Sequence, residues 1–532
     1  MTGPSRRRTE PAHPPAVTKD LAAMRSVTPV VARSLPLLLA AGATVSSATT
    51  PASAATAAVK PAAAILASTT VPGARDSLTP AQRLAAVQSA KQINYYPAGG
   101  SWTRMWTDFD AKKIDADLAK ARALGADSVR AIVFPSAFGY PTPKPEYAAK
   151  LAQFVSLAAA RGMTVKVTLF DWWDGYSDVA GSTTWANALL APFRNDDRII
   201  SIELQNELDP TDPAAIGWAK KLLPVIRKAV PGVPVTIPIS SSAGVAGLST
   251  LKSAMAATPL DYYDFHLYGN SERALASIRQ AQAAVAPAPL VIGETGTNTL
   301  QSSEGEQAAY LARVFAAAEV AGVNAVAPWT LNDFAAGSIP DSGVARIPEQ
   351  YWYGLYRADS TAKPAAAVAK AEWNGAPSPT GLMDLGFENA AGQTPWRSYL
   401  SDLGTPTRTQ TAARSGKWSV MLTNTGKTAA GSPSYRVSPI EPVQPGRRWH
   451  AEVWVRGKNE TGSTQIALSW FDVNDRWIGG ASSADLPSGT TDWTRLSVDG
   501  VAPAGAASLQ VHLKSGADTG TVWFDDVAIS AS

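Results

Sequence analysis

The feature that most constrains the fold is an eightfold alternation between residues 85 and 375. Short runs rich in β-branched residues alternate there with Ala-rich segments whose apolar residues recur at helical spacing. Eight βα units in a stretch of this length predict an α/β fold of the (β/α)8 TIM-barrel type. The runs expected to be strands are Lys91–Tyr96, Ser128–Phe134, Thr164–Phe170, Ile199–Leu204, Pro234–Ile239, Tyr262–His266, Leu290–Gly293 and Asn324–Trp329. The segments expected to be helices include Ala111–Leu124, Tyr147–Arg161, Ala214–Ala229, Glu272–Val285 and Gly305–Ala321.

Side-chain alternation within these runs predicts charged residues inside the barrel. Alternate residues of a strand point to opposite faces, and the β-branched faces suit packing against helices. The other face of the second, third and fourth runs carries Arg130, Lys166 and Glu203. Because buried charges persist only when they are paired, we expect Glu203 to pair with Lys166 or Arg130.

After residue 375 the sequence changes character. Residues 376–380 form a Pro- and Ser-containing linker, and residues 381–532 contain short alternating runs separated by Gly, Ser, Pro and Asp turns. This pattern predicts an all-β jelly-roll or β-sandwich domain. Its expected strands include Trp418–Thr423, Trp449–Arg456, Gln465–Phe471, Thr494–Val498, Ser508–Lys514 and Thr521–Ile529.

The first 54 residues have the pattern of a secretory signal peptide. An apolar segment, Val30–Val45, is followed by Ala52-Ser53-Ala54, whose small residues suit signal peptidase cleavage after Ala54. Translation from either Met1 or Met24 is compatible with this pattern, and the arginines at 6–8 leave export by the twin-arginine or the general route open. Residues 55–84 are expected to be a linker. The prediction is a secreted, extracellular protein with no membrane anchor after cleavage.

Composition excludes several kinds of chemistry. The chain has no Cys, which excludes a cysteine nucleophile, disulfides and thiolate-bound metals. Of its four histidines only His266 lies in the barrel, so a His-rich metal site cannot form there. Residues 1–54 carry six Lys/Arg against two acids, so their removal changes the formal charge from +3 to −1, and nothing indicates a nucleic-acid partner. The 17 tryptophans favour ligands that stack on rings, such as sugars, although about half should be core residues.

Polar residues collect at the C-terminal ends of the expected strands, where barrel enzymes have their active sites. Glu207 and Glu294 follow the fourth and seventh runs and should face each other across the lumen. Two carboxyl groups in such an arrangement suit glycoside hydrolysis, in which one protonates the leaving oxygen and the other attacks the anomeric carbon. The other residues at these ends are Arg130, Asp171, Asn206, His266, Tyr268 and Trp329.

The barrel resembles the retaining β-glycosidases of clan A, which include the cellulase-like family 5 enzymes. The resemblance covers residues 85–375. It rests on Glu203-Leu204-Gln205-Asn206-Glu207 as the family's E-L-x-N-E, His266-Leu267-Tyr268 as its H-x-Y, Ile292-Gly293-Glu294 as its nucleophile strand, Trp329 at the end of the eighth run, and Arg130 at its second-strand arginine.

The resemblance implies a role for each of these residues. Glu207 would be the acid/base, with a raised pKa, and Glu294 the ionised nucleophile. Asn206 would bind the sugar hydroxyl beside the anomeric carbon, while Arg130 and Tyr268 would aim Glu294. His266 would line the subsite and Trp329 would form its floor. No cofactor is expected for catalysis.

One departure from family 5 lies after the third run. Enzymes of that family commonly carry a His there, whereas this chain has Phe170-Asp171-Trp172-Trp173-Asp174. The departure points to a divergent branch of the superfamily. It makes Asp171, Trp172, Trp173 and Asp174 candidate substrate contacts.

The C-terminal domain resembles the carbohydrate-binding β-sandwiches attached to such enzymes. The matching stretches are Leu385-Gly386-Phe387-Glu388, Trp449–Arg456 and Val522-Trp523-Phe524-Asp525-Asp526-Val527. The resemblance implies that Glu388 and Asp526 share a structural calcium ion, whose preferred ligands are oxygens. Possible sugar platforms are Trp396, Tyr399, Trp418, Trp470 and Trp477.

These observations favour a secreted, monomeric, retaining β-glycoside hydrolase that acts in endo mode on a β-linked polysaccharide. Glucan, mannan, xylan and galactan all fit. One alternative is a non-catalytic carbohydrate-binding or cell-wall protein on a degenerate barrel, which the presence of both carboxylates disfavours. Another is a barrel lyase or aldolase with Lys166 as a Schiff-base lysine, but Lys166 lies in mid-strand rather than at the mouth.

Overall fold

The computed structural model describes residues 78–340, 342–424 and 432–532. The expected signal peptide and most of the expected linker, up to residue 77, lie outside the described residues. Among those described, no helix combines the length and hydrophobicity needed to cross a membrane.

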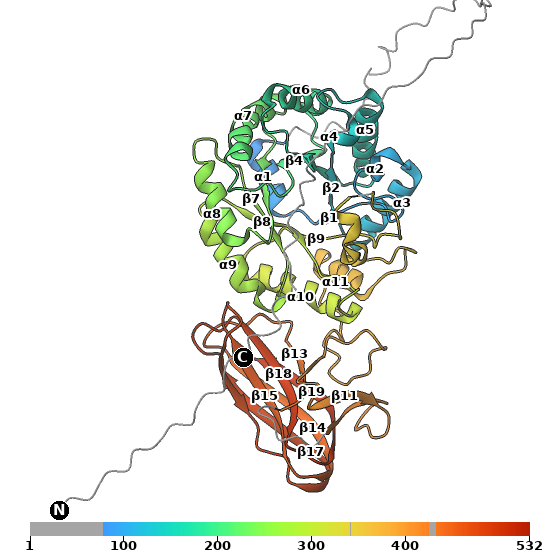
Figure 1. Cartoon of the computed structure of the whole chain (residues 1–532), viewed down its shortest axis with the longest axis vertical. Coiled ribbons are helices and arrows are strands. Elements are labelled where there is room, and N and C mark those ends of the chain that lie inside the picture. The colour runs from blue at the N-terminus through green and yellow to red at the C-terminus, as the bar shows by residue number, and fades with distance from the viewer. Residues whose placement is uncertain (1–77, 341, 425–431) are drawn as a thin grey trace, which may run out of the picture. The chain divides into compact units, whose positions relative to one another are not determined.

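The first domain is the predicted (β/α)8 barrel, with helices surrounding parallel strands (Figure 1). Neighbouring strands pair in chain order. The fifth is divided into β5 and β6, and Pro238, which cannot donate a backbone hydrogen bond, begins β6. The strands are β1 Gln92–Asn94, β2 Ser128–Ile132, β3 Thr164–Phe170, β4 Ile199–Gln205, β5 Val235–Thr236, β6 Pro238–Ile239, β7 Tyr263–Leu267, β8 Leu290–Thr295 and β9 Val326–Pro328.

Asn94 on β1 both donates and accepts hydrogen bonds that close the circle of strands. The Leu331 N–H donates to the Asn94 carbonyl at 3.0 Å, and the Asn94 side-chain amide donates to the carbonyls of Gly293 at 2.8 Å and Pro328 at 3.3 Å. The first strand is thereby tied to the eighth and ninth labelled strands, so the barrel has no open edge.

The five predicted barrel helices are present, with small shifts at their ends. Local signals define them: α3, for example, begins after Asp110, whose side chain accepts hydrogen bonds from two backbone N–H groups, and ends at Gly125 with φ 106°. The helices are α1 Pro80–Gln88, α2 Arg104–Thr107, α3 Ala111–Leu124, α4 Pro135–Phe138, α5 Pro145–Ala160, α6 Val179–Leu190, α7 Pro213–Ala229, α8 Gly244–Ala254, α9 Ala274–Val285, α10 Glu304–Ala321 and α11 Pro364–Trp373.

Helix α1 corrects one prediction, because it begins inside the stretch expected to be a linker. A reciprocal pair of hydrogen bonds between Thr79 and Gln82 caps its start. Val87 of this helix packs with Ile200 and Val291 at the beginnings of barrel strands, and Arg83 donates to the Ile199 carbonyl at 2.6 Å. The helix therefore closes the N-terminal end of the barrel, opposite the expected active site.

The second domain is a sandwich of two five-stranded antiparallel sheets, as predicted. The orders are β10-β13-β18-β15-β16 and β11-β12-β19-β14-β17. Its core includes Trp396, Trp449 and Trp470. The strands are β10 Arg397–Tyr399, β11 Gly404–Thr409, β12 Ser419–Asn424, β13 Ser434–Val437, β14 Arg448–Glu460, β15 Ser463–Phe471, β16 Trp477–Ser482, β17 Gly489–Val501, β18 Ser508–Gly516 and β19 Thr521–Ala531.

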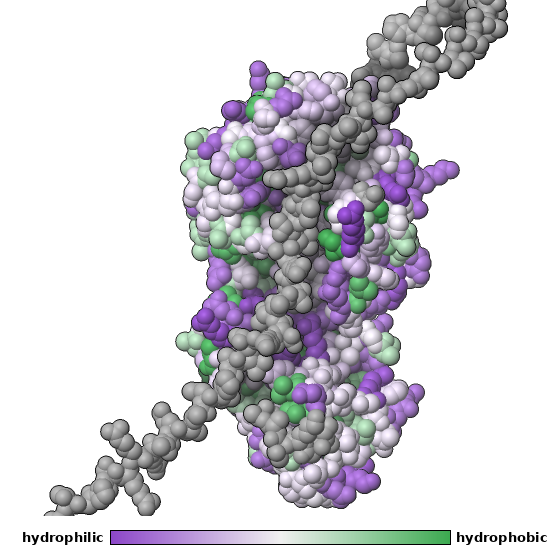
Figure 2. All heavy atoms as spheres, viewed as in Figure 1, coloured by the Kyte–Doolittle hydropathy of each residue, from purple (hydrophilic) through white to green (hydrophobic). Residues whose placement is uncertain are grey.

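Large apolar side chains are mostly buried in the described residues. On the face shown in Figure 2, hydrophobic residues form small scattered patches among hydrophilic ones. The most exposed aromatic side chains are Trp477 and Tyr399 in the sandwich and Trp172 and Trp352 in the barrel domain.

Candidate active site

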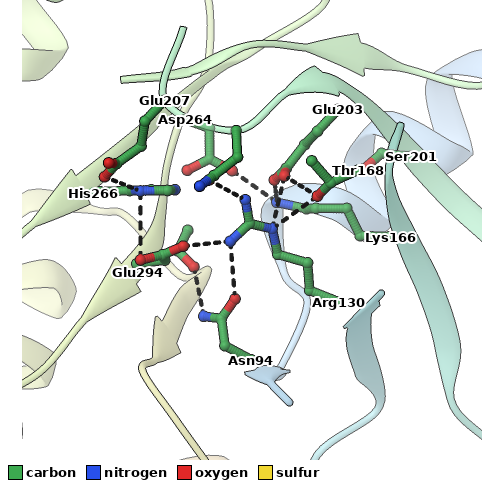
Figure 3. Close-up of polar contacts among 12 residues, drawn as sticks. Asn94, Arg130, Lys166, Thr168, Ser201, Glu203, Glu207, Asp264, His266 and Glu294 are labelled. Atoms are coloured by element: carbon green, nitrogen blue, oxygen red, sulfur yellow. Dashed lines mark hydrogen bonds and ion pairs between the residues drawn. The ribbon is translucent and has the colours of Figure 1, made fainter. Parts of the chain in front are cut away.

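Arg130, on β2, is the centre of a hydrogen-bonded cluster inside the barrel (Figure 3). Its guanidinium faces a different partner with each nitrogen. Nε donates to Glu203 at 2.7 Å, Nη2 donates to the side-chain carbonyl of Asn206 at 2.8 Å, and Nη1 donates to Glu294. The expected pairing of Glu203 is confirmed, because its carboxylate also lies 3.2 Å from Lys166 Nζ and is fully buried.

Glu294, near the end of β8, is a buried carboxylate held from several sides. Arg130 donates to Oε1, the Tyr268 hydroxyl donates to Oε2 at 2.7 Å, and His266 Nδ1 lies 3.5 Å from Oε2. Gly293 precedes it because a side chain there would collide with Asp264: an added Cβ would lie 2.0 Å from Asp264 Oδ1. The two arms of Glu294 are thus fixed by one cation and one hydroxyl.

Glu207 follows β4 with φ 47°, a left-handed conformation that is uncommon for a residue with a side chain. Its side chain is 39% exposed, and Oε1 lies 2.8 Å from His266 Nδ1. One ligand atom from each of Glu207, His266 and Glu294 lies within 4.8 Å of the other two. This close approach suits retaining glycosidases, whose carboxyl groups are about 5–5.5 Å apart, rather than inverting enzymes at about 6.5–9.5 Å.

The pKa values of the two carboxyls differ from the expectation. Burial acts to raise the pKa of Glu207, but the hydrogen bond with His266 and the charges of His266 and Arg130 outweigh it and lower that pKa. For Glu294, burial and the Glu207 charge prevail over His266, Arg130 and Tyr268, and raise the pKa. Burial lowers and the two carboxylates raise the pKa of His266, and the net shift is upward. The physical reason is that His266 contacts Glu207 directly, rather than merely lining the subsite.

Asp171 lies directly after β3 and is almost fully buried, with 5% of its surface exposed. Its Oδ1 accepts the Trp172 N–H at 3.0 Å, and Asn206 also donates to its side chain. Burial raises the pKa of Asp171 to about 7, in spite of the opposing effects of Arg130, the Trp172 N–H and Asn206. The structure therefore brings Asp171, Asn206 and Arg130 together as a hydrogen-bonded group.

Aromatic side chains border this group. Trp329 is 8% exposed and packs edge-on against Tyr96 and Trp102, with ring centroids 6.0 Å apart in each pair. Trp172 is 42% exposed and meets Phe134 edge-on at 5.3 Å. Trp172 is therefore available to a ligand, whereas Trp329 exposes only a small part of its ring.

The neighbouring candidates in the same loop behave differently. Trp173 packs against Tyr140 at 4.4 Å and Phe170 at 5.4 Å, so it is largely a packing residue. Asp174 is exposed. The loop thus presents Trp172 outward and holds itself in place through Trp173.

Two residues near the centre were missed in the sequence. Tyr96 is fully buried with no hydrogen-bond partner for its hydroxyl, and burial together with the charge of Asp171 raises its pKa. Asp264, on β7, bonds to Lys166 at 2.7 Å. Alternation along β7 could have indicated Asp264, because it lies two residues before His266 on the same face.

The expected calcium site gains no support from its geometry. Glu388 accepts the backbone N–H groups of Lys417 and Trp418, each at 2.8 Å. Asp526 accepts Arg414 and the Ser415 hydroxyl, both at 2.6 Å. Each carboxylate is thus satisfied by its own donors rather than directed toward shared oxygen ligands.

In the described part of the chain, only Glu207, His266 and Glu294 have acidic or imidazole groups clustered closely enough for a metal ion. Arg130 and Tyr268 already donate to both oxygens of Glu294. A cation and a hydroxyl donor in these positions fit an acid–base pair rather than a metal site.

Residues 89–334 match the family model described as cellulase, glycosyl hydrolase family 5. The barrel is a family 5 glycoside hydrolase domain. It belongs to the clan A retaining enzymes that the motifs indicated, and family 5 itself is matched despite the departure after β3. The domain is an enzyme that acts on β-glycosides. No curated protein sequence matches the chain.

Several solved structures of glycoside hydrolases are similar to about half of this chain at low identity. An exo-β-1,4-mannosidase from Opitutaceae bacterium strain TAV5 is 19% identical with a TM-score of 0.46 over 53% of this chain, which spans 59% of that protein. GH5_18 from Streptomyces cattleya, solved with GlcNAc, is 20% identical with a TM-score of 0.47 over 55% of this chain and 82% of that one. GH5_18 from Bifidobacterium longum subsp. infantis is 17% identical with a TM-score of 0.47 over 55% and 80%.

Proposed function

We propose that the protein is a secreted, retaining β-glycoside hydrolase in which Glu294 is the nucleophile and Glu207 the acid/base. One observation carries the assignment: Glu207 and Glu294 approach each other within 4.8 Å, and Arg130 and Tyr268 hold only Glu294. A carboxylate fixed by donors on both oxygens is preorganised to attack. The freer, partly exposed Glu207 is placed to exchange protons with the leaving group and with water.

In the first step a Glu294 oxygen attacks the anomeric carbon while Glu207 gives its proton to the glycosidic oxygen. The bond to the leaving sugar breaks, and a covalent glycosyl–enzyme ester forms. In the second step Glu207 takes a proton from water, the water oxygen attacks the same carbon, and Glu294 leaves as a carboxylate. Two inversions give net retention.

His266 connects the two carboxyls and favours a negative Glu207 before substrate arrives. If a glycosidic oxygen replaced the His266 imidazole as the hydrogen-bond partner of Glu207, the hydrogen bond that lowers the Glu207 pKa would be lost. The negative charge of Glu294 would then favour the protonated form of Glu207. Ester formation removes that charge, so Glu207 becomes the base that the second step requires.

The remaining mouth residues are proposed substrate contacts. Asn206, locked by Arg130 on one side and Asp171 on the other, suits the hydroxyl beside the anomeric carbon, a contact that strengthens in the transition state. Trp329 supplies an apolar wall and Trp172 an exposed ring at the entrance. Asp171 offers a second polar group next to Asn206.

The proposed substrate is a β-linked polysaccharide, attacked in endo mode by a monomeric enzyme outside the cell. Its support is the signal-like leader and the β-sandwich, which we propose binds carbohydrate. Of the candidate platforms, Trp477 is 64% exposed and Tyr399 is also exposed, while Trp396 and Trp470 belong to the sandwich core. Trp477 and Tyr399 are therefore the better candidates for sugar contacts.

The test is a panel of β-glucan, β-mannan, β-xylan and β-galactan treated with wild type, Glu294→Ala and Glu146→Ala. Glu146 is an exposed glutamate at the start of α5 and serves as the matched control. We expect new reducing ends from at least one polymer with wild type and the control, and none with Glu294→Ala. Equal background release by all three proteins would refute the enzyme assignment, and the initial anomer seen by NMR tests retention.

A further inference from the structure

The proposed mechanism leaves several buried charges of the barrel without a role. Lys166, Glu203 and Asp264 are at most 3% exposed, and none of them contacts both catalytic carboxyls or reaches the mouth. Buried ion pairs are expensive and often add little stability compared with apolar packing. Their presence below an active site therefore suggests a task that apolar side chains cannot perform.

These side chains form a continuous series of polar contacts that ends on Arg130 (Figure 3). Asp264 Oδ2 lies 2.7 Å from Lys166 Nζ, which lies 3.2 Å from Glu203 Oε1. Glu203 Oε2 lies 2.7 Å from Arg130 Nε and accepts the Thr168 hydroxyl at 2.6 Å. Each of these contacts is a hydrogen bond or ion pair, so the series runs without a break from Asp264 to the guanidinium group of Arg130.

The guanidinium is planar, so the direction of one nitrogen determines the direction of the others. Glu203 fixes Nε, while Nη1 contacts Glu294 and Nη2 holds Asn206. Thr168 adds a second restraint, because its hydroxyl accepts from Nε at 3.1 Å. The orientation of Nε therefore aims both the proposed nucleophile and the amide proposed to bind the sugar.

Glu203 also reduces the net positive charge next to Glu294, the proposed nucleophile. Arg130 and Lys166 are balanced by Glu203 and Asp264, which leaves Glu294 as an additional negative group. Burial acts to raise the pKa of Glu203, but Arg130, Lys166 and the Thr168 hydroxyl lower it to about 2, so Glu203 stays ionised.

We propose that Glu203, supported by Lys166 and Thr168, is a positioning residue for the glycosidase reaction, holding Arg130 in the one orientation that serves Glu294 and Asn206 together. The inference rests on the proposed function. It assigns Glu203 no contact with substrate, and its effect passes entirely through Arg130.

Two substitutions at Glu203 separate position from packing. Glu203→Gln keeps a carbonyl acceptor for Arg130 Nε, whereas Glu203→Met keeps the side-chain length without an acceptor. Misplacement of a reacting group by about 1 Å can cost about 100-fold in rate. We therefore expect kcat to fall about 100-fold or more in Glu203→Met and about tenfold in Glu203→Gln, with KM changing little.

The substrates are the 2,4-dinitrophenyl and methylumbelliferyl β-glycosides of the β-linked disaccharides of glucose, mannose, xylose and galactose, which suit the proposed endo mode. The dinitrophenyl group leaves without protonation, so kcat/KM for its release reports on attack by Glu294 without proton donation by Glu207, and kcat/KM is the quantity compared between the two leaving groups. A positioning defect should slow both leaving groups alike, while Glu207→Ala should slow mainly the less reactive one. Rates are taken per folded molecule, measured by near-ultraviolet circular dichroism.

The matched control is Glu306→Met, which breaks a buried ion pair with Arg313 at 3.1 Å on α10, outside the strand ring. It should lose stability and keep kcat. If Glu203→Met does not fold, Thr168→Val removes one restraint on Arg130 and should lower kcat about tenfold. Wild-type kcat in the folded fraction of the Glu203 and Thr168 variants would overturn the inference alone. A wild type inactive on all eight glycosides and the four polymers would overturn the proposed function as well.

Discussion

Replacing Asp171 by Asn should stabilise the barrel at neutral and alkaline pH. Asp171 is 5% exposed, and burial raises its pKa to about 7 from 3.8. Arg130, the Trp172 N–H and Asn206 act in the opposite direction without prevailing. The fold thus holds this proton more tightly than the unfolded chain does, and an Asn of nearly the same shape never ionises.

The sign follows from counting protons. Between about pH 4 and pH 7 the folded state retains the proton and the unfolded state has lost it, so the stability of the wild type declines as the pH rises. At about 1.36 kcal/mol for each tenfold change in proton affinity, a pKa of 3.8 unfolded and about 7 folded corresponds to about 4 kcal/mol above pH 7. Relaxation around the charge makes this an upper estimate.

The assay is urea unfolding of the barrel from pH 5 to pH 8.5 for wild type, Asp171→Asn and Asp174→Asn. Asp174 is exposed in the same loop and serves as the control. The free energy of unfolding of Asp171→Asn minus that of wild type should grow by about 2–3 kcal/mol between pH 5 and pH 8. A difference that stays constant, or shrinks as the pH rises, would refute the reasoning, and the stabilised variant should bind substrate more weakly.

Three further outcomes follow from individual contacts. Gly293→Ala should fail to accumulate as folded protein, judged by circular dichroism, because its Cβ would lie 2.0 Å from Asp264 Oδ1. Tyr268→Phe removes the 2.7 Å hydrogen bond that lowers the pKa of Glu294, so the acidic limb of the kcat/KM profile should move to higher pH and kcat should fall about 10–100-fold. Trp172→Ala should raise KM several-fold and shift Tm by less than about 2 °C, since the ring is 42% exposed.

The architecture of both domains could be predicted because it depends on periodicity. β3 has the bounds that its β-branched run indicated, and β4 extends one residue further than expected. The linker prediction failed at Pro80 because reciprocal capping hydrogen bonds between Thr79 and Gln82 start a helix within an Ala- and Pro-rich stretch. The short helices α2 and α4 leave no periodic pattern, since each has only four residues.

The pKa order of the catalytic pair was not predictable in the same way. It depends on the His266–Glu207 contact at 2.8 Å, and that contact depends on the left-handed backbone of Glu207. Neither a sequence motif nor a strand pattern predicts that a non-glycine residue will adopt a positive φ. The burial of Asp171 is similar, because the loop that covers it has no repeating pattern.

Side-chain alternation along the strands identifies residues that support the site and that the motifs do not include. On β7 and just beyond it, Asp264, His266 and Tyr268 lie two positions apart and bond to Lys166, Glu207 and Glu294, respectively. On and after β4, Glu203 lies four positions before Glu207, which is twice that spacing. A residue two or four positions before a mouth residue therefore belongs to the layer that supports it. In this barrel the supporting layer is charged, so the reach of the active site extends down to Glu203 and Asp264.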